Sequence, residues 1–173
     1  MVGCKSNQVS TSTASRSPAA PSTTAQRQPV TAPPTVKKHL YSAEADPKAD
    51  IAAALKQAGL EHKRVILDFG GDWCGDCQVL DIYYHQSPNA ELLAKNFILV
   101  HINIGHMDKN VDVAKKYNVP ITKGVPALAV IDANGKLLYA EREKEFEHPS
   151  PEAITAFLNR WKPVKNAAPL KKS

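Results

Sequence analysis

Two cysteines two residues apart, Cys74 and Cys77, lie between a short apolar run and a helical pattern. The run Val65–Leu67 is aliphatic, largely β-branched and bounded by charge, which predicts a buried strand. Apolar residues recur at helical spacing from Val79 to Tyr84, and Gly70-Gly71 is expected to form the turn between strand and helix. At the start of that helix, unpaired backbone N–H groups and the helix dipole favour a thiolate. Position and spacing therefore predict a redox-active dithiol.

One helical turn brings the sulfur atoms of Cys74 and Cys77 within bonding range. Cys74 lies nearer the exposed turn and is expected to be the attacking thiolate, whereas Cys77, further into the helix, is the expected resolving thiol. The alternative is half of a zinc site or a pair of structural cysteines. A tetrahedral zinc site needs four ligands, and the sequence has no second Cys-x-x-Cys or Cys/His pair at suitable spacing. We therefore expect no metal and no cofactor beyond the redox-active disulfide.

The stretch from Val65 to Tyr84 resembles the active site of the thioredoxin superfamily, in which a strand, Asp-Phe, a short turn, Trp-Cys-x-x-Cys and a helix follow one another. Further on, Lys123-Gly124-Val125-Pro126-Ala127 is similar to the Gly-hydrophobic-Pro loop of that family. The resemblance covers about residues 60–161. It implies that the Pro126 bond is cis and that this proline packs opposite the disulfide. The alternative is a trans proline at the start of an edge strand.

The resemblance also implies an acid–base pair below the cysteines. Asp68 interrupts an apolar strand and aligns with the buried aspartate of the family, which would take the proton of the resolving thiol, directly or through water. The alternative is an aspartate at a strand end that reaches solvent. His101 aligns with a lysine that faces this aspartate, and would shuttle protons; it is equally read as an ordinary half-buried strand histidine.

A substrate-binding surface is implied around the same motif. The indole before the first cysteine would cover the disulfide, and the backbone beside the cis-proline would pair with an extended substrate segment. The expected substrate-binding residues are Trp73, Gly75, Asp76, Val125 and Pro126.

The sequence departs from classical thioredoxins in three places. An acid, Asp76, lies between the cysteines and should disfavour the thiolate of Cys74. The reduced form is then less stable, so the dithiol is expected to act as a reductant of other disulfides. Gly70-Gly71 replaces a Trp-Ala pair, which is expected to thin the surface beside the disulfide and loosen the turn. The segment Asn118–Gly124 carries an extra proline and is longer than the loop of the family.

The remaining pattern alternates helices and strands. Asp46 is expected to cap a helix that begins at Pro47 and is closed by Gly59, and Asn134-Gly135 predicts a hairpin turn. The segment Glu141–His148 looks polar, irregular and frayed. Further helices are expected near residues 90–94, 110–117 and 151–161, and strands at 65–69, 97–104, 127–131 and 136–139. This order predicts an α/β, thioredoxin-like fold, with a central mixed β-sheet covered by helices on both faces.

Composition divides the chain into three parts. Residues 1–38 are rich in Ser, Thr, Ala and Pro and predict a disordered linker, residues 39–162 the thioredoxin-like domain, and residues 163–173 a basic tail. Met1-Val2-Gly3-Cys4 resembles the end of a bacterial lipobox, which would make Cys4 the lipidated residue of a membrane tether. The charged and apolar parts of such a signal are missing. The alternative is that Cys4 is an ordinary exposed thiol.

These features favour an enzyme, a protein-disulfide reductase of the bacterial cell envelope or periplasm, monomeric and recycled by a membrane or soluble reductant. The cytoplasm is the alternative location, and oxidase or isomerase action is a variant of the same chemistry. The net charge of +5 is modest and spread over both ends of the chain, which suggests no nucleic-acid partner, and no run of eighteen apolar residues predicts a membrane span. The second hypothesis is a binding module that holds a client protein, or copper through Cys74, Cys77 and His106.

Overall fold

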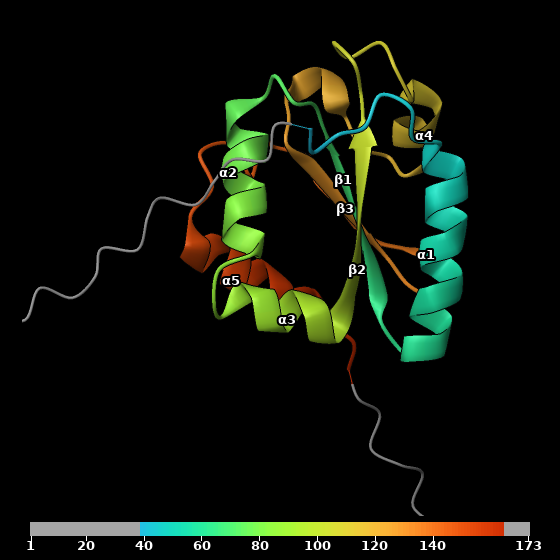
Figure 1. The fold of residues 1–173 in the computed structure, drawn as a ribbon, viewed down its shortest axis with the longest axis vertical. Helices are drawn as coiled ribbons and strands as arrows, with labels where there is room; N and C mark the ends of the chain where they lie inside the picture. Colours follow the sequence, from blue (N-terminus) through green and yellow to red (C-terminus); the bar gives the residue numbers. More distant parts are fainter. Residues whose placement is uncertain (1–38, 165–173) are drawn as a thin grey trace, which may run out of the picture. The chain divides into compact units, whose positions relative to one another are not determined.

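A four-stranded sheet with strand order β2-β1-β3-β4 forms the centre of the fold (Figure 1). The computed structural model describes residues 39–164, so the predicted linker with Cys4 and most of the predicted tail lie outside the described residues. β1 pairs parallel with β2 and antiparallel with β3, and β3 pairs antiparallel with β4, so the sheet is mixed as predicted. The strands are β1 (Arg64–Gly70), β2 (Phe97–Asn103), β3 (Ala127–Ile131) and β4 (Leu137–Ala140).

Helices cover both faces of this sheet, which confirms the predicted α/β, thioredoxin-like architecture (Figure 1). Two apolar clusters fill the layers between helices and sheet, one containing residues of α1 and α4 and the other residues of α2 and α5, with α3 packed against the second. None of the helices between residues 39 and 164 has both the length and the apolar character needed to cross a membrane. The helices are α1 (Pro47–Glu61), α2 (Gly75–Tyr84), α3 (Asn89–Asn96), α4 (Val111–Lys116) and α5 (Pro151–Trp161), with a short 3₁₀ helix η1 (Ile121–Lys123) before β3.

The alternation of side chains along β1 decides what lies under α2. Val65, Leu67 and Phe69 pack into the cluster of α1 and α4, whereas Ile66 packs into the cluster of α2 and α5. Because successive side chains of a strand point to opposite faces, Asp68 shares the face of Ile66. The single acid of this strand is thereby directed into the layer beneath the helix that carries the cysteines.

The register between β1 and β2 brings His101 to the same place. Asp68 is paired with His101 across the parallel ladder. Val100 and Ile102 belong to the cluster of α1 and α4, so His101, between them, points to the α2 face. Two titratable side chains from neighbouring strands therefore meet under α2.

The first helix begins as predicted but ends later. Asp46 accepts hydrogen bonds from the N–H groups of Lys48 and Ala49, with Pro47 at the first helical position. The prediction that Gly59 closes the helix is wrong, because the helix continues to Glu61 and His62 adopts the left-handed conformation at its end, with φ of 55°. The N–H of His62 satisfies the carbonyl of Ala58, which is the role expected of a terminal glycine.

The segment Glu141–His148 has no regular helix or strand, but it is anchored rather than frayed. Glu141 and Phe146 are 2% and 3% exposed. The Glu141 carboxyl accepts hydrogen bonds from the N–H groups of Leu128 (3.0 Å) and Phe146 (3.4 Å), and so joins the segment to β3. Burial raises the pKa of Glu141 from its ordinary value of 4.5 to about 7.

This buried carboxyl predicts a pH dependence of stability. Between pH 4.5 and about 7 the folded chain binds the proton of Glu141 more tightly than the unfolded chain, so the free energy of unfolding falls as the pH rises through this window. The loss is on the order of 2–3 kcal/mol. Glu141→Gln should abolish this slope in urea unfolding at a series of pH values. Glu143→Gln, an exposed neighbour, should keep it, and equal slopes for Glu141→Gln and the parent chain would contradict the assignment.

Candidate active site

The two cysteines form a disulfide at the beginning of α2. Cys74 occupies the N-cap position, its Cα lies 5.3 Å from that of Cys77, and its sulfur accepts a hydrogen bond from the Cys77 N–H at 3.1 Å. Cys77 is fully buried and Cys74 is 6% exposed. The pair therefore lies at the predicted junction of strand and helix, with Cys77 the more shielded of the two.

The Gly-Val-Pro loop lies directly against the disulfide. The carbonyl oxygen of Val125 is 3.5 Å from the sulfur of Cys74. The Val125–Pro126 peptide bond is cis. This loop leads into β3, the neighbour of β1, so the sheet fixes it beside the turn that carries the cysteines.

Asp68 lies fully buried below this loop and helix. Its Oδ2 atom accepts a hydrogen bond from the hydroxyl of Tyr41 at 3.0 Å and lies 3.0 Å from Nδ1 of His101. Its Oδ1 atom has no hydrogen-bond partner among residues 39–164. The alternative in which this aspartate reaches solvent is therefore wrong, and one oxygen of the carboxyl is left without a donor.

Tyr41 is a site residue that the sequence did not reveal. It is 1% exposed and forms a small buried cluster with Cys74 and Cys77. A Cβ atom on Gly70 would lie 2.5 Å from the Tyr41 hydroxyl and 2.9 Å from the Cys77 sulfur. The expectation that Gly70-Gly71 thins the surface beside the disulfide is therefore wrong, because the tyrosine ring occupies the space that the glycine leaves. Burial and the nearby Asp68 carboxylate raise the pKa of Tyr41 well above its usual value, so the hydroxyl stays protonated.

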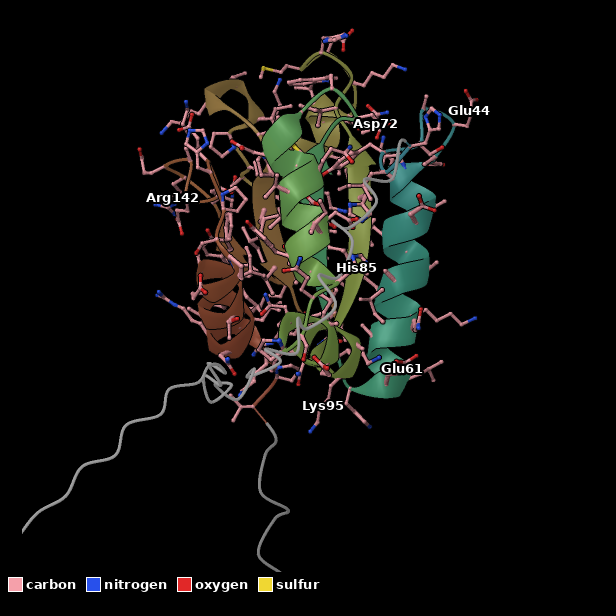
Figure 2. The ribbon with its side chains drawn as sticks, turned by 60° about the vertical axis from the view of Figure 1, so that its left-hand side comes forward. Glu44, Glu61, Asp72, His85, Lys95 and Arg142 are labelled. Atoms are coloured by element: carbon pink, nitrogen blue, oxygen red, sulfur yellow. A yellow bond between two sulfur atoms is a disulfide. The ribbon has the colours of Figure 1, made fainter. Side chains whose placement is uncertain are left out.

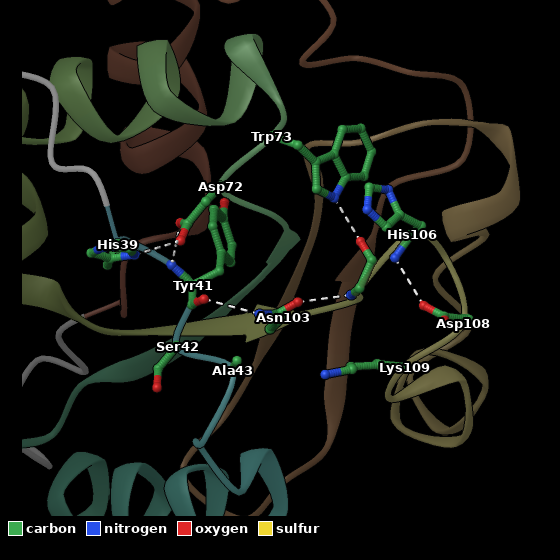
Figure 3. Close-up of a pocket in the computed structure, with 11 residues that line it drawn as sticks. His39, Tyr41, Ser42, Ala43, Asp72, Trp73, Asn103, His106, Asp108 and Lys109 are labelled. Carbon is green, nitrogen blue, oxygen red and sulfur yellow. Dashed lines mark hydrogen bonds and ion pairs between the residues drawn. The ribbon is translucent and has the colours of Figure 1, made fainter.

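Two polar side chains hold this tyrosine in place (Figure 3). Oδ1 of Asp72 accepts hydrogen bonds from the N–H groups of Leu40 and Tyr41, both at 2.8 Å. The side-chain amide of Asn103, at the end of β2, donates to the carbonyl of Tyr41 at 2.9 Å. The segment before α1 is thus fastened to the turn of the redox motif on one side and to the sheet on the other.

Trp73 is half exposed and packs against the loop that follows β2. Its indole N–H donates to the carbonyl of Gly105 at 2.6 Å, and its ring stacks on that of His106 with centroids 5.6 Å apart (Figure 3). A hollow of about 570 Å³ opens beside it. The hollow is lined by His39, Tyr41, Ser42, Ala43, Asp72, Trp73, Asn103, Gly105, His106, Asp108 and Lys109.

The two residues between the cysteines differ in their surroundings. Nothing lies within 4 Å of a Cβ built on Gly75, so this side of the site is open. Asp76 turns towards the segment after β4, where Oδ2 accepts a hydrogen bond from the N–H of His148 at 3.1 Å and Oδ1 lies 3.5 Å from its ring nitrogen Nδ1. The acid is therefore fixed in the first turn of α2.

The copper hypothesis finds no ligand set in this arrangement. Within residues 39–164, no three His, Cys, Asp or Glu side chains lie in positions that could hold a metal ion together. His106, its predicted third ligand, is stacked on Trp73 instead.

Comparison with known proteins agrees with this geometry. A family model described as thioredoxin-like matches residues 46–133, about half of the chain. The chain belongs to the thioredoxin-like family. The crystal structure of a disulphide isomerase from Xylella fastidiosa Temecula1 is 32% identical, with a TM-score of 0.66, and the match covers 70% of this chain and 95% of that one.

Two further proteins align with this chain over shorter stretches. The thiol:disulfide interchange protein DsbD of Vibrio cholerae serotype O1 is 26% identical over 89 residues, which is 51% of this chain and 14% of that protein. Thioredoxin-3 of Dictyostelium discoideum is 30% identical over 61 residues, or 35% of this chain and 56% of that protein. The matched region thus spans less than two thirds of either protein.

The fit between Gly70 and Tyr41 predicts that Gly70→Ala destabilises the protein. The added methyl group would meet the Tyr41 hydroxyl and the Cys77 sulfur, and overpacking of this kind lowers the free energy of unfolding by about 1–3 kcal/mol. Gly59→Ala is the matched control, since nothing lies within 4 Å of its Cβ and alanine favours the helix, raising stability by about 0.5–1 kcal/mol. Urea unfolding of both variants measures the difference, and a Gly70→Ala protein as stable as its parent would show that the close contact is absent.

Proposed function

We propose that the protein exchanges its Cys74–Cys77 dithiol with disulfides of other proteins, in the reducing direction. The observation that supports this most directly is the disulfide at the N-terminus of α2, between the cis-proline loop and a buried carboxyl. Membership of a family of disulfide oxidoreductases agrees with it.

In the proposed reaction, the Cys74 thiolate attacks one sulfur of a substrate disulfide, and the other substrate sulfur leaves as a thiolate. Cys77 then loses its proton to Asp68 and attacks Cys74, which releases the second substrate sulfur and re-forms the Cys74–Cys77 disulfide. The substrate gains two electrons and the dithiol loses two. The unpartnered Oδ1 atom of Asp68 is suited to receive this proton, and His101, in contact with the other oxygen, is its proposed shuttle partner.

The proposed substrate-binding surface surrounds Cys74. The backbone of Val125 and Pro126 would pair with an extended segment of the substrate, since it already approaches the sulfur. Gly75 leaves room for that segment, and Trp73 offers a half-exposed aromatic face at the edge of the site. Asp76 adds a negative charge to the same rim.

The proposed compartment is the bacterial cell envelope, with the chain held to the membrane by a lipid on Cys4 and recycled by a reductant in the membrane or in solution. The resemblance of the first four residues to a lipobox and the Ser/Thr/Pro-rich segment after them support this. We propose a monomer. Isomerase action is the second candidate, because the relative with 32% identity carries the name of a disulphide isomerase. Reshuffling of scrambled ribonuclease, compared with insulin reduction, separates the two activities.

Three cysteines allow a controlled test of the catalytic assignment. Insulin reduction with dithiothreitol as electron donor should be lost in Cys74→Ser and retained in Cys4→Ser. Cys77→Ser should accumulate a mixed disulfide with the substrate, visible as a larger band on non-reducing gels, because the resolving step is blocked. Undiminished insulin reduction by Cys74→Ser would refute the proposal.

The direction of exchange is tested at Asp76. Replacement by Asn removes a negative charge from the first turn of α2, which should stabilise the Cys74 thiolate and hence the reduced form. The reduction potential, measured by equilibration with glutathione, should therefore rise by on the order of 10–30 mV. An unchanged or lower potential in Asp76→Asn would show that this acid does not bias the site towards reduction.

A further inference from the structure

The proton that Asp68 receives in the resolving step must leave before the next cycle. Asp68 is fully buried, and a bound substrate would cover the disulfide above it. The proton therefore needs a path to solvent through neighbouring side chains, and the contacts of Asp68 indicate which side chains form it.

His101 lies between two carboxyl groups. Its Nδ1 atom is 3.0 Å from Oδ2 of Asp68, and its Nε2 atom is 3.7 Å from Oδ1 of Asp81, in α2. The side chain of Asp68 is 0% exposed, whereas those of His101 and Asp81 are 20% and 8% exposed. An imidazole that faces a carboxyl at each nitrogen can take up a proton on one side and release it on the other.

Asp81 is placed by the helix that carries the cysteines. It follows Cys77 by four residues and His85 follows it by four more, so the three lie along one stripe of α2. His85 Nδ1 lies 2.7 Å from the carbonyl oxygen of Asp81 and 3.3 Å from its Oδ1 atom. The side chain of His85 is 53% exposed and lies past the C-terminal end of α2, at the opposite end from Asp72 and the redox turn (Figure 2).

We propose that His101 and Asp81 relay the proton of the resolving thiol from Asp68 to solvent near the C-terminal end of α2, with His85 holding Asp81 towards His101. This inference rests on the proposed function. The proton passes from Cys77 to Oδ1 of Asp68 as the thiol ionises, and rotation of the carboxylic acid then presents it to His101. Nδ1 of His101 accepts this proton while the proton on Nε2 moves to Asp81 and from there to water. His101, which is partly exposed, regains its starting tautomer by exchanging ring protons with water before the next cycle. Asp68 returns to its carboxylate form, and no electrons move in this part of the cycle.

The other titratable groups packed around Asp68 do not compete for the proton. Tyr41, from the segment before α1, donates its hydroxyl hydrogen to Asp68. Tyr84, in α2, is fully buried, and burial together with the charges of Asp68 and Glu141 raises its pKa well above the usual value. Both phenols therefore stay neutral over the working pH range, and among residues 39–164 the route through His101 remains.

The resolving step can be followed with the aromatic disulfide dithiobis(nitrobenzoate), in a Cys4→Ser background that leaves only the redox pair. The reduced protein releases one coloured thiolate when Cys74 attacks, and a second when Cys77 resolves the mixed disulfide. Stopped-flow absorbance at a series of pH values gives a rate for each phase. We expect Asp81→Asn to slow the second phase about tenfold and to shift its pH profile, with the first phase unchanged.

Four variants complete the test. Asp68→Asn should slow the second phase by at least a hundredfold, as expected for loss of the base itself. His101→Gln should slow it about as much as Asp81→Asn, and the double variant should be no slower than the slower single one, because both act in one series. His101→Gln also serves as the test if Asp81→Asn unfolds. Asp50→Asn, an exposed acid of α1, is the matched control and should leave both phases unchanged.

The outcomes separate the relay from the function on which it depends. A first phase that is absent, or that persists without Cys74, refutes the proposed function. The relay would be refuted if both phases are present and the second phase of Asp81→Asn has the same rate and pH profile as that of the parent. That result would leave the proposed oxidoreductase activity intact. Additive losses in the double variant would also refute it, since they would mean that the two residues act independently.

Discussion

A carboxyl group buried on the central strand is the constraint on which this site depends. An ionisable group without solvent is costly unless polar partners surround it, and Asp68 is in contact with the hydroxyl of Tyr41 and the ring of His101. Those two side chains come from a segment before the first helix and from the neighbouring strand. The same carboxyl therefore links three parts of the chain beside the disulfide, and the strand register places His101 opposite Asp68.

Much of the fold could be predicted because it is encoded locally. The alternation of apolar residues defines the strands, and Asp46-Pro47 marks a helix start where the structure has it. The predicted end of α1 is wrong because His62, in the left-handed conformation, terminates the helix at a position where glycine is the usual residue. The redox turn itself was predictable from cysteine spacing, since a strand followed by a helix N-terminus leaves few arrangements for two sulfurs.

The residues that sequence reasoning missed owe their positions to tertiary packing. Tyr41 precedes Asp68 by 27 residues in a segment without helix or strand, so no periodicity connects them. A signal was nevertheless present, because two adjacent glycines beside a buried cysteine require some other side chain to fill the space. Asp81 and His85 have the spacing of an ordinary pair on a helix surface, and only the approach of His101 from β2 shows that Asp81 faces inward. Glu141 was similarly concealed in a segment whose composition is polar.

The attachment of residues 39–41 to Asp72 and Asn103 also bears on where this domain should be considered to begin. The family model starts at residue 46, after the tyrosine that closes the space beside Cys77. A boundary drawn from family likeness alone would therefore exclude Tyr41, which packs against both cysteines. A fragment that begins at residue 46 would retain the Cys-x-x-Cys and Gly-Val-Pro motifs but would lose the side chain that covers Asp68. In this chain, the segment before α1 therefore belongs to the same structural unit as the disulfide.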